Sequence, residues 1–376
     1  MLLKKRRLNY RVVIPLGILA LAGLRLLLLE RLPAYLRPGL RLDAYVANTA
    51  DGTVTAIDLV KLVPVATIAV GAEPSGVRAH PVRDEIWGVS SDAGVAWVID
   101  TRSNAVVARI PVGGAPFALD FSPDGRRAYV AASASNSVAA IDCASRRIVA
   151  RGRAGRTPWI ARLTPDGKTV VVSNRDDATV SLLDANTLAP LAVVPVAPRP
   201  EQIAILPDSS KAFITSGGSS QVAVVDLRRR VLLANLDIGG IPDDLDLKGD
   251  GGELYITMAE AHGLVIVNTQ TNDVAEFLLL GMAPTAGALA SDDSVFYVSD
   301  SMAGHVVPIA IDQRRVARPI QVGQRPGQLA LTPGDDMLLV VDTQSNDLAV
   351  VRTATSGLIT LIPVGQRPRD IAIKMF

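Results

Sequence analysis

The sequence predicts an all-β fold, a β-propeller of eight four-stranded blades, preceded by one transmembrane helix. Three observations predict it: a 42-residue repeat, four short apolar segments within each repeat, and a basic N-terminus followed by an apolar run. Fixed periods of about 40 residues containing several short strands are typical of propeller blades. The repeat is marked by a Gly-x-x-Pro-like turn that recurs without insertion, at Pro74, Pro116, Pro158, Pro200, Pro242, Pro284, Pro326 and Pro368.

The N-terminal segment predicts a membrane anchor. Residues 1–11 are basic, and residues 12–29 are apolar except for Arg25. Eighteen residues at about 1.5 Å per residue make a helix about 27 Å long, close to the thickness of a hydrocarbon core. The positive-inside rule then keeps residues 1–11 in the cytoplasm and places the remainder on the periplasmic or extracellular side. Ala20-Leu21-Ala22 has the form of a signal-peptidase site, so a cleaved signal peptide is the alternative.

Residues 30–42 are expected to be a linker, and residues 43–376 the propeller. Within each repeat, the first strand follows the proline, and a tight turn such as Ser122-Pro123-Asp124-Gly125 leads into a second, nearly continuous apolar strand. The third strand ends on an acidic residue in five copies, and the fourth runs into the next Gly-x-x-Pro-like turn. Continuous apolar strands are expected where a sheet is covered on both faces, as a blade is by its neighbours.

The phase of the repeat predicts the number of blades. The body opens in a second strand at Asp43 and closes with a lone first strand over 370–374. The C-terminal strand therefore completes the blade that the N-terminal strands begin, which gives eight blades and leaves no open sheet edge. Seven blades with spare strands at both ends is the alternative.

Short motifs within the repeats resemble the YVTN-type β-propeller family. They are Ala44-Tyr45-Val46-Ala47-Asn48, the Ser-Pro-Asp-Gly turn at 122–125, Val98-Ile99-Asp100 and Ile110-Pro111-Val112-Gly113. The resemblance spans about 334 residues and implies a propeller that is exported or lies at the cell surface, without implying an activity. That family is usually described with seven blades, so the predicted eight are a departure from it.

Charge and cysteine content exclude several classes of function. Residues 1–41 carry nine basic and one acidic side chain, and the remaining chain carries 29 basic and 36 acidic ones. An acidic body argues against nucleic-acid binding, which needs clustered positive charge. The single cysteine, Cys143, excludes an intrachain disulfide and a cysteine-based metal cage. It follows Asp142 at a strand end, where we expect an inert, half-buried thiol.

The strand directions place all Gly-x-x-Pro-like turns and all loops between second and third strands on one face, named the top face. Around the prolines the repeat varies, and a ring of charged and aromatic residues is expected at the mouth of the central channel. Such a ring could clamp an anion with arginine and stack on a planar group, or its charges could simply pair across blades. The candidate ligand- or partner-binding residues are Phe117, Arg156, Trp159, Arg199, Glu201, Gln202, Asp243, Asp244, Arg325, Arg367 and Arg369. Deeper in the strands, Arg78, Asp120, Arg162 and Asp246 occupy equivalent positions.

No catalytic constellation emerges, and no metal or cofactor is predicted. His80 replaces the serine of a bottom-face turn, so we expect it to be a turn residue. His262 and His305 fall in or beside top-face loops, where they could supply ligands to a metal. The sequence therefore predicts a non-catalytic, membrane-tethered propeller that binds a protein partner through its top face, as a scaffold or complex subunit. The alternative is a lactonase-like or quinoprotein-like enzyme, or a carrier of a tetrapyrrole or similar cofactor, with its site at the channel mouth.

Overall fold

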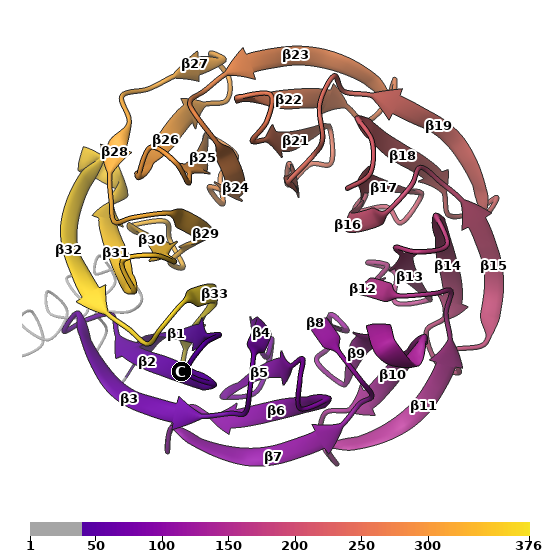
Figure 1. The fold of residues 1–376 in the computed structure, drawn as a ribbon, viewed down its shortest axis with the longest axis horizontal. Helices are drawn as coiled ribbons and strands as arrows, with labels where there is room; N and C mark the ends of the chain where they lie inside the picture. Colours follow the sequence, from indigo (N-terminus) through magenta and orange to yellow (C-terminus); the bar gives the residue numbers. More distant parts are fainter. Residues whose placement is uncertain (1–39) are drawn as a thin grey trace, which may run out of the picture.

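A computed structural model describes residues 40–376, which form eight antiparallel sheets arranged around a central channel (Figure 1). Each sheet contains four strands in radial order, and in one of them the outermost strand is split in two. The predicted eight-bladed, all-β architecture is confirmed, and seven blades are excluded. The predicted anchor at 12–29 and most of the linker lie outside the described residues. Within 40–376, no helix is long and apolar enough to cross a bilayer.

The strands repeat in the order that the sequence predicts, from the channel outward. The innermost strands are β4 (Pro74–Ala79), β8 (Pro116–Phe121), β12 (Pro158–Leu163), β16 (Pro200–Ile205), β20 (Asp244–Leu247), β24 (Pro284–Leu289), β29 (Pro326–Leu331) and β33 (Pro368–Met375). The second strands are β1 (Leu42–Asn48), β5 (Glu85–Ser90), β9 (Arg127–Ala132), β13 (Thr169–Asn174), β17 (Lys211–Ser216), β21 (Glu253–Met258), β25 (Val295–Asp300) and β30 (Met337–Asp342).

The third strands are β2 (Thr53–Asp58), β6 (Val95–Asp100), β10 (Ser137–Asp142), β14 (Thr179–Asp184), β18 (Gln221–Asp226), β22 (Gly263–Asn268), β26 (His305–Ala310) and β31 (Asp347–Arg352). The outer strands are β3 (Val63–Ala69), β7 (Ala105–Pro111), β11 (Arg147–Arg153), β15 (Pro190–Pro195), β19 (Val231–Asp237), β23 (Asp273–Leu279), β27 (Arg315–Val316) with β28 (Ile320–Gln321), and β32 (Gly357–Pro363). Two short 3-10 helices, η2 (Ser133–Ser135) and η3 (Thr353–Thr355), occupy loops. Blades are numbered from blade 1 (β33, β1, β2, β3) and blade 2 (β4–β7) to blade 8 (β29–β32).

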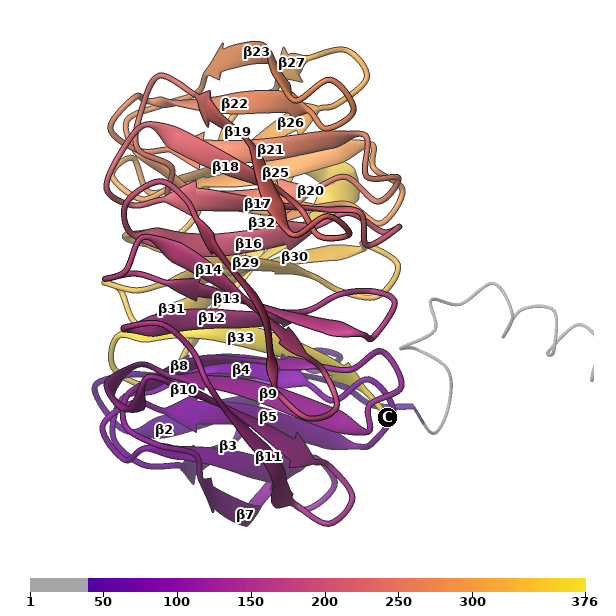
Figure 2. The ribbon, with the colours of Figure 1, turned by 90° about the vertical axis from the view of Figure 1, so that its right-hand side faces the viewer.

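Blade 1 closes the ring with strands from both ends of the propeller. Its innermost strand β33 pairs with β1 along the whole length of β1, and β33 is longer than the predicted 370–374. Arg41 and Phe376 exchange backbone hydrogen bonds of 2.8 and 3.0 Å, so the two ends of the described chain meet on one face (Figure 2). That face is opposite the Gly-x-x-Pro-like turns and is called the bottom face.

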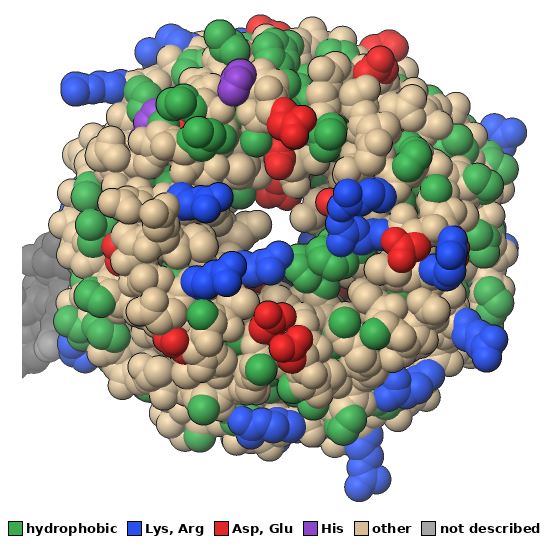
Figure 3. All heavy atoms as spheres, in the orientation of Figure 1, with side chains coloured by type: hydrophobic (Ala, Val, Ile, Leu, Met, Phe, Trp, Pro, Cys, Tyr) green, Lys and Arg blue, Asp and Glu red, His purple; other side chains and the backbone are tan. Residues whose placement is uncertain are grey.

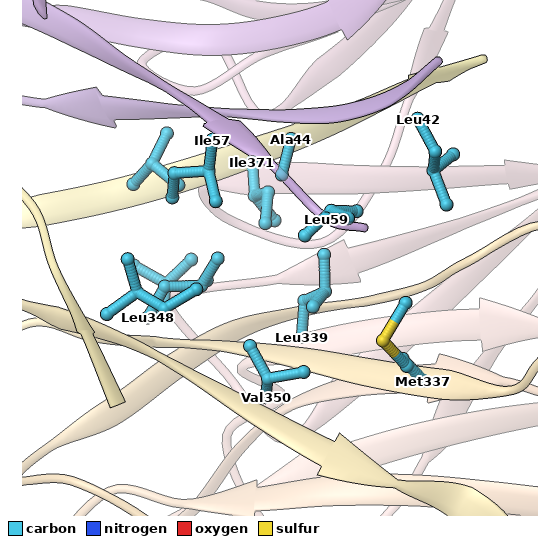
Figure 4. Packing of buried hydrophobic residues seen from close by; sticks show 12 residues of the cluster. Leu42, Ala44, Ile57, Leu59, Met337, Leu339, Leu348, Val350 and Ile371 are labelled. Carbon is cyan, nitrogen blue, oxygen red and sulfur yellow. The ribbon is translucent and has the colours of Figure 1, made fainter. Parts of the chain in front are cut away.

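The closure is held by apolar packing as well as by hydrogen bonds. Figure 4 shows side chains of blade 1 interdigitating with side chains of blade 8, including Ile57, Leu59, Leu339 and Leu348, each at most 2% exposed. Because second and third strands are covered by a blade on either side, they are buried along nearly their whole length. Burying a leucine or isoleucine side chain contributes about 1.5–3 kcal/mol, so this interface stabilises the ring strongly.

Ion pairs on the bottom face join neighbouring blades. Glu85 of blade 2 is 4% exposed and accepts hydrogen bonds from Trp87 Nε1 (2.9 Å) and from Arg146 of blade 3 (2.9 Å). Glu253 and Arg314 make the equivalent pair between blades 6 and 7. The aspartates that end third strands are also structural; Asp142 Oδ1, for example, accepts from Ser145 N at 2.7 Å.

Two blades depart from the repeat. In blade 6, β20 begins two residues after Pro242 and is only four residues long. In blade 7, the outer strand is broken between β27 and β28, where residues 317–319 end in a proline, and Ala317 N instead bonds to Pro308 O at 2.8 Å. Proline donates no ladder hydrogen bond, which accounts for the interruption.

Candidate functional site

A cavity of about 290 Å³ lies at the mouth of the central channel on the top face. Figure 3 shows this face, with a central opening that lysine or arginine side chains border. The cavity is built from the first residues of the inner strands, where the strand register is irregular in several blades. Bulges of this kind redirect side chains and often border functional sites. The lining residues are Ser75, Gly76, Phe117, Ala118, Gln202, Thr285, Ala286, Gly327, Gln328, Thr343, Arg369 and Asp370.

One side of the mouth is a stack of aromatic rings and guanidinium groups. Phe117 and Trp159 lie face to face, with ring centroids 3.9 Å apart and an interplanar angle of 20°. Arg369 lies over the Phe117 ring at 5.0 Å, and Arg175 lies over the Trp159 ring at 4.1 Å. Arg175 also contacts Glu201 at 2.5 Å. The stack therefore places cations on both outer sides of an aromatic pair, an arrangement that attracts planar and anionic groups.

Gly76 of blade 2 allows this stack to form across a blade. Arg369 belongs to blade 1 and Phe117 to blade 3, and blade 2 presents only Ser75 and Gly76 between them. Gly76 has a φ of +55°, and a Cβ there would lie 2.7 Å from both Ala118 Cα and Phe117 O. Only glycine combines this backbone angle with so close an approach of two strands.

Below the mouth, charges on the channel wall pair between neighbouring blades, as the sequence alternative anticipated. Arg78 Nη1 lies 3.3 Å from Asp370 Oδ2, and Arg162 Nη1 lies 3.6 Å from Asp120 Oδ1. These pairs connect blades 1 to 2 and blades 3 to 4, so one half of the channel wall is neutralised.

Blade 6 adds the carboxyl groups of Asp244 and Asp246, which form no such ion pair with an arginine of a neighbouring blade. Burial raises the pKa of Asp244 to about 6, although backbone amides and the distant Arg162 and Arg78 oppose the shift. Burial and the neighbouring Asp244 raise the pKa of Asp246 well above its ordinary value, and Asp246 Oδ2 is buried without a hydrogen-bond partner. The pair therefore retains protons to a higher pH than isolated aspartates would.

The predicted site residues fall into two groups, those at or just below the mouth and those that lie elsewhere. Phe117, Trp159, Glu201, Gln202 and Arg369 lie at the mouth, with Arg199 beside Glu201 (3.3 Å) and Asp244 on the channel wall below. Arg175, the first residue of the loop after β13, is the member of the stack that sequence reasoning missed, although its place in a top-face loop could have indicated it.

The remaining predicted residues have other partners. Arg156 is tied to Asp177 at 2.5 Å, and Arg325 lines a separate cavity between blades 7 and 8. Arg367 is exposed, and its backbone N donates to Asn346 Oδ1 at 2.8 Å. In the other blades, the first residue after the second strand donates its backbone N–H to the carbonyl of the residue before the proline. In blade 6, Ala259 N donates instead to Asp243 Oδ2, at 2.6 Å.

The histidines and the cysteine do not contribute to the cavity. His80 is a buried turn residue, as expected, whose ring accepts from Val82 N and Arg83 N. His262 Nδ1 contacts Met282 O at 2.6 Å, and His305 lies 3.7 Å from Asp300. Among residues 40–376, no three His, Cys, Asp or Glu residues are grouped to hold a metal ion. Cys143 is 1% exposed, so it is fully buried and not half-buried as expected.

Comparison with known proteins identifies the family. The family model described as the cytochrome D1 heme domain matches residues 84–274, about half of the chain. The chain belongs to the cytochrome D1 heme domain family. Among curated proteins, none matches it. The family match supports a propeller family without singling out YVTN repeats.

Several solved structures of different proteins have the same fold. Dihydro-heme d1 dehydrogenase NirN, in complex with DHE, has a TM-score of 0.76 at 16% identity, over 88% of this chain and 74% of that one. Hydrazine synthase of Kuenenia stuttgartiensis has a TM-score of 0.61 at 17% identity, over 75% of this chain and 96% of that one. AztD of Citrobacter koseri has a TM-score of 0.69 at 13% identity, over 90% of this chain and 98% of that one. At these identities the likeness shows the shared fold.

The cytochrome D1 heme domain family implies a heme, and the cavity fits such a group only in part. Heme iron takes axial ligands from His, Met, Cys or Tyr side chains. None of these types is among the residues that line the cavity at the mouth. The wall of this cavity therefore offers cations and aromatic rings for a planar anion, but no ligand for iron.

Proposed function

We propose that this propeller binds a planar organic anion at the channel mouth on its top face. The observation that carries the proposal is the stack of Arg369, Phe117, Trp159 and Arg175 beside the 290 Å³ cavity. Arginine provides charge-assisted hydrogen bonds to carboxylates, and its planar guanidinium group, here backed by an aromatic ring, can itself stack on a planar ligand. Gln202 and Gln328 add neutral hydrogen-bonding groups on other sides of the cavity.

The family match supports the cofactor-binding alternative better than the scaffold that the sequence favoured. A tetrapyrrole is planar and bears carboxylates, so it is the ligand class to test first. Because the cavity wall supplies no axial ligand, the ring and its carboxylates would carry the affinity, and iron would add nothing. The cavity is near the lower limit of ligand pockets, so a ring of this size would cover the mouth and not enter it.

A direct test titrates the full chain in mild detergent with metal-free protoporphyrin IX and with its iron form, following porphyrin absorption. We expect both forms to bind with similar affinity. Arg369→Gln should weaken both by about tenfold or more, since a hydrogen bond to a charged group contributes about 1.5–3 kcal/mol. Arg102→Gln, which removes an exposed bottom-face arginine paired with Asp84 at 2.7 Å, should change nothing.

Three results would count against the proposal. Absence of porphyrin binding would exclude this ligand class, and equal effects of the two arginine variants would exclude the channel mouth. Tight binding of the iron form alone, abolished by His262→Ala, would place the site on the top-face loops of blades 6 and 7.

The anchor and the extracytoplasmic location remain part of the proposal. A tether at residue 40 would join the bottom face, where Arg41 and Phe376 meet, so the channel mouth would face away from the membrane. A partner-binding role is a second candidate, favoured by Leu279, Met282 and Met302, which are 71%, 55% and 70% exposed. Serine substitutions at both methionines should release a copurifying partner if this surface binds it.

A further inference from the structure

We propose that blade 8 contains a binding site for a calcium ion between Asp342 and Asp347, at the edge of a cavity between blades 7 and 8. This site is distinct from the channel mouth, and the proposal does not depend on the identity of the ligand bound there. The two residues bracket the top-face loop that joins β30 to β31, and they are paired directly across the two strands.

The repeat shows what this loop contains in other blades. The residue equivalent to Asp342 is Asn48 in blade 1, Ala132 in blade 3 and Asn174 in blade 4. Both asparagines have hydroxyl partners. Asn48 Nδ2 donates to Thr53 Oγ1 at 3.0 Å, and Asn174 Nδ2 donates to Thr179 Oγ1 at 3.0 Å. Blade 8 is the one described blade in which both of these positions are acidic.

Asp342 keeps the acceptor function of the asparagine side chain and loses its donor function. Asp342 Oδ2 accepts from Gly323 N at 3.1 Å, as Asn174 Oδ1 accepts from Gly155 N at 3.0 Å. Asp342 Oδ1 takes the place of the asparagine Nδ2, and it faces the carboxylate of Asp347. Two acceptors therefore meet where the other blades pair a donor with an acceptor.

Burial makes this arrangement costly without a cation. Asp342 is 0% exposed, and Oδ1 of Asp342 and Oδ1 of Asp347 are both buried without a hydrogen-bond partner. Two buried carboxylates that face each other are destabilising unless a cation or a shared proton neutralises them, and a bound cation would do so at a pH where both are ionised. Carboxylate oxygens favour a hard cation such as calcium, which accepts irregular geometry and retains water ligands.

The surroundings supply a third oxygen and a route of entry. A Cβ on Gly323 would lie 2.5 Å from Ser345 Oγ and 2.6 Å from Asp342 Oδ2, so both oxygens border the space that glycine leaves open; Ser345 Oγ also accepts from Gln324 N at 2.9 Å. Asp347 and Ser345 line a cavity of about 590 Å³ that is open to the top face. Arg325 is exposed at the rim of this cavity, and its charge would favour release of the cation over tight retention.

The test is equilibrium dialysis of the chelator-treated full chain against ⁴⁵Ca²⁺ at pH 8, in mild detergent, with a parallel thermal melt. The decisive variant is D342N/D347T, which recreates the Asn174–Thr179 pair and should fold without a cation. We expect one calcium per wild-type chain and a calcium-dependent rise in Tm. In the double variant, affinity should fall by more than the 10- to 100-fold that changes around a metal's ligands typically cause.

Asp92→Asn is the matched control, because Asp92 is an exposed acid in the equivalent loop of blade 2. It should bind calcium as the wild type does. The proposal is overturned if the wild type binds no calcium, or if D342N/D347T binds it equally well. A wild type that ignores calcium but gains stability as pH falls would show that the pair holds a shared proton instead.

Discussion

Gly76 provides the sharpest test of how the channel mouth is built. A methyl group at this position would lie 2.7 Å from Ala118 Cα and from Phe117 O, and both contacts are with backbone that cannot rotate away. The left-handed backbone at φ +55° adds a second penalty for any residue with a Cβ. The left-handed conformation costs about 1–2 kcal/mol, and overpacking costs about 1–3 kcal/mol. We expect Gly76→Ala to lower the free energy of unfolding by about 2–5 kcal/mol.

Gly167 is the matched control for the backbone penalty alone. It has a φ of +72°, and a Cβ there would meet nothing within 4 Å. Gly167→Ala should therefore lose only about 1–2 kcal/mol. Urea unfolding of both variants, followed by circular dichroism, measures the difference between them. Losses that agree within about 0.5 kcal/mol would refute the close approach of β4 and β8.

Gly76→Ala should also disturb ligand binding if the proposed site is correct. The added methyl group pushes on the backbone that carries Phe117, so the ring would shift relative to Trp159 and Arg369. We expect weaker porphyrin binding in Gly76→Ala and unchanged binding in Gly167→Ala. Unchanged binding in both, together with a large loss of stability, would separate the fold argument from the proposed function.

Three further predictions concern buried ionisable groups. Burial raises the pKa of Asp244 from 3.8 to about 6, so the folded state binds a proton that the unfolded state releases; the unfolding free energy should fall as pH rises from about 4 to 6. Urea titrations across this range should show a shallower fall in Asp244→Asn. Burial raises the pKa of the Cys143 thiol to about 12, so iodoacetamide should label it only after unfolding, as mass spectrometry would show. Glu85→Ala should cost about 3–5 kcal/mol because it strands buried donors, including Trp87 Nε1, whereas removal of the exposed Asp124 should cost less than about 1 kcal/mol; equal losses would contradict the buried-pair argument.

Much of the fold could be predicted from local sequence. The 42-residue interval between prolines follows from the length of four short strands and their turns, so it predicted both the blade and its strand order. The phase of the repeat predicted that β33 would complete blade 1, because β1 lacks an inner neighbour in its own segment. His80 was predicted to be a turn residue for the same reason, since alignment of the repeats assigns each position a structural role.

The candidate site could be predicted only in outline. Position relative to the prolines placed Phe117, Trp159 and Arg369 near the mouth, but it could not separate them from Arg156, which binds Asp177. The same positional rule selected Asp243, whose carboxylate closes its own blade in place of a backbone carbonyl. Repeats assign a residue to a ring but do not indicate which partner its side chain reaches.

The sequence by itself determined the number of blades, the order of their strands and the face to which each loop belongs. These depend on periodicity, apolar patterning and turn residues, all of which are local properties of the chain. Only the tertiary structure decided that Arg369 would reach across blade 2 to Phe117, and that Asp342 and Asp347 would face each other without a donor. Those contacts depend on how closely neighbouring segments approach, which is decided by small residues such as Gly76 in β4 and Gly323 in the turn before β29.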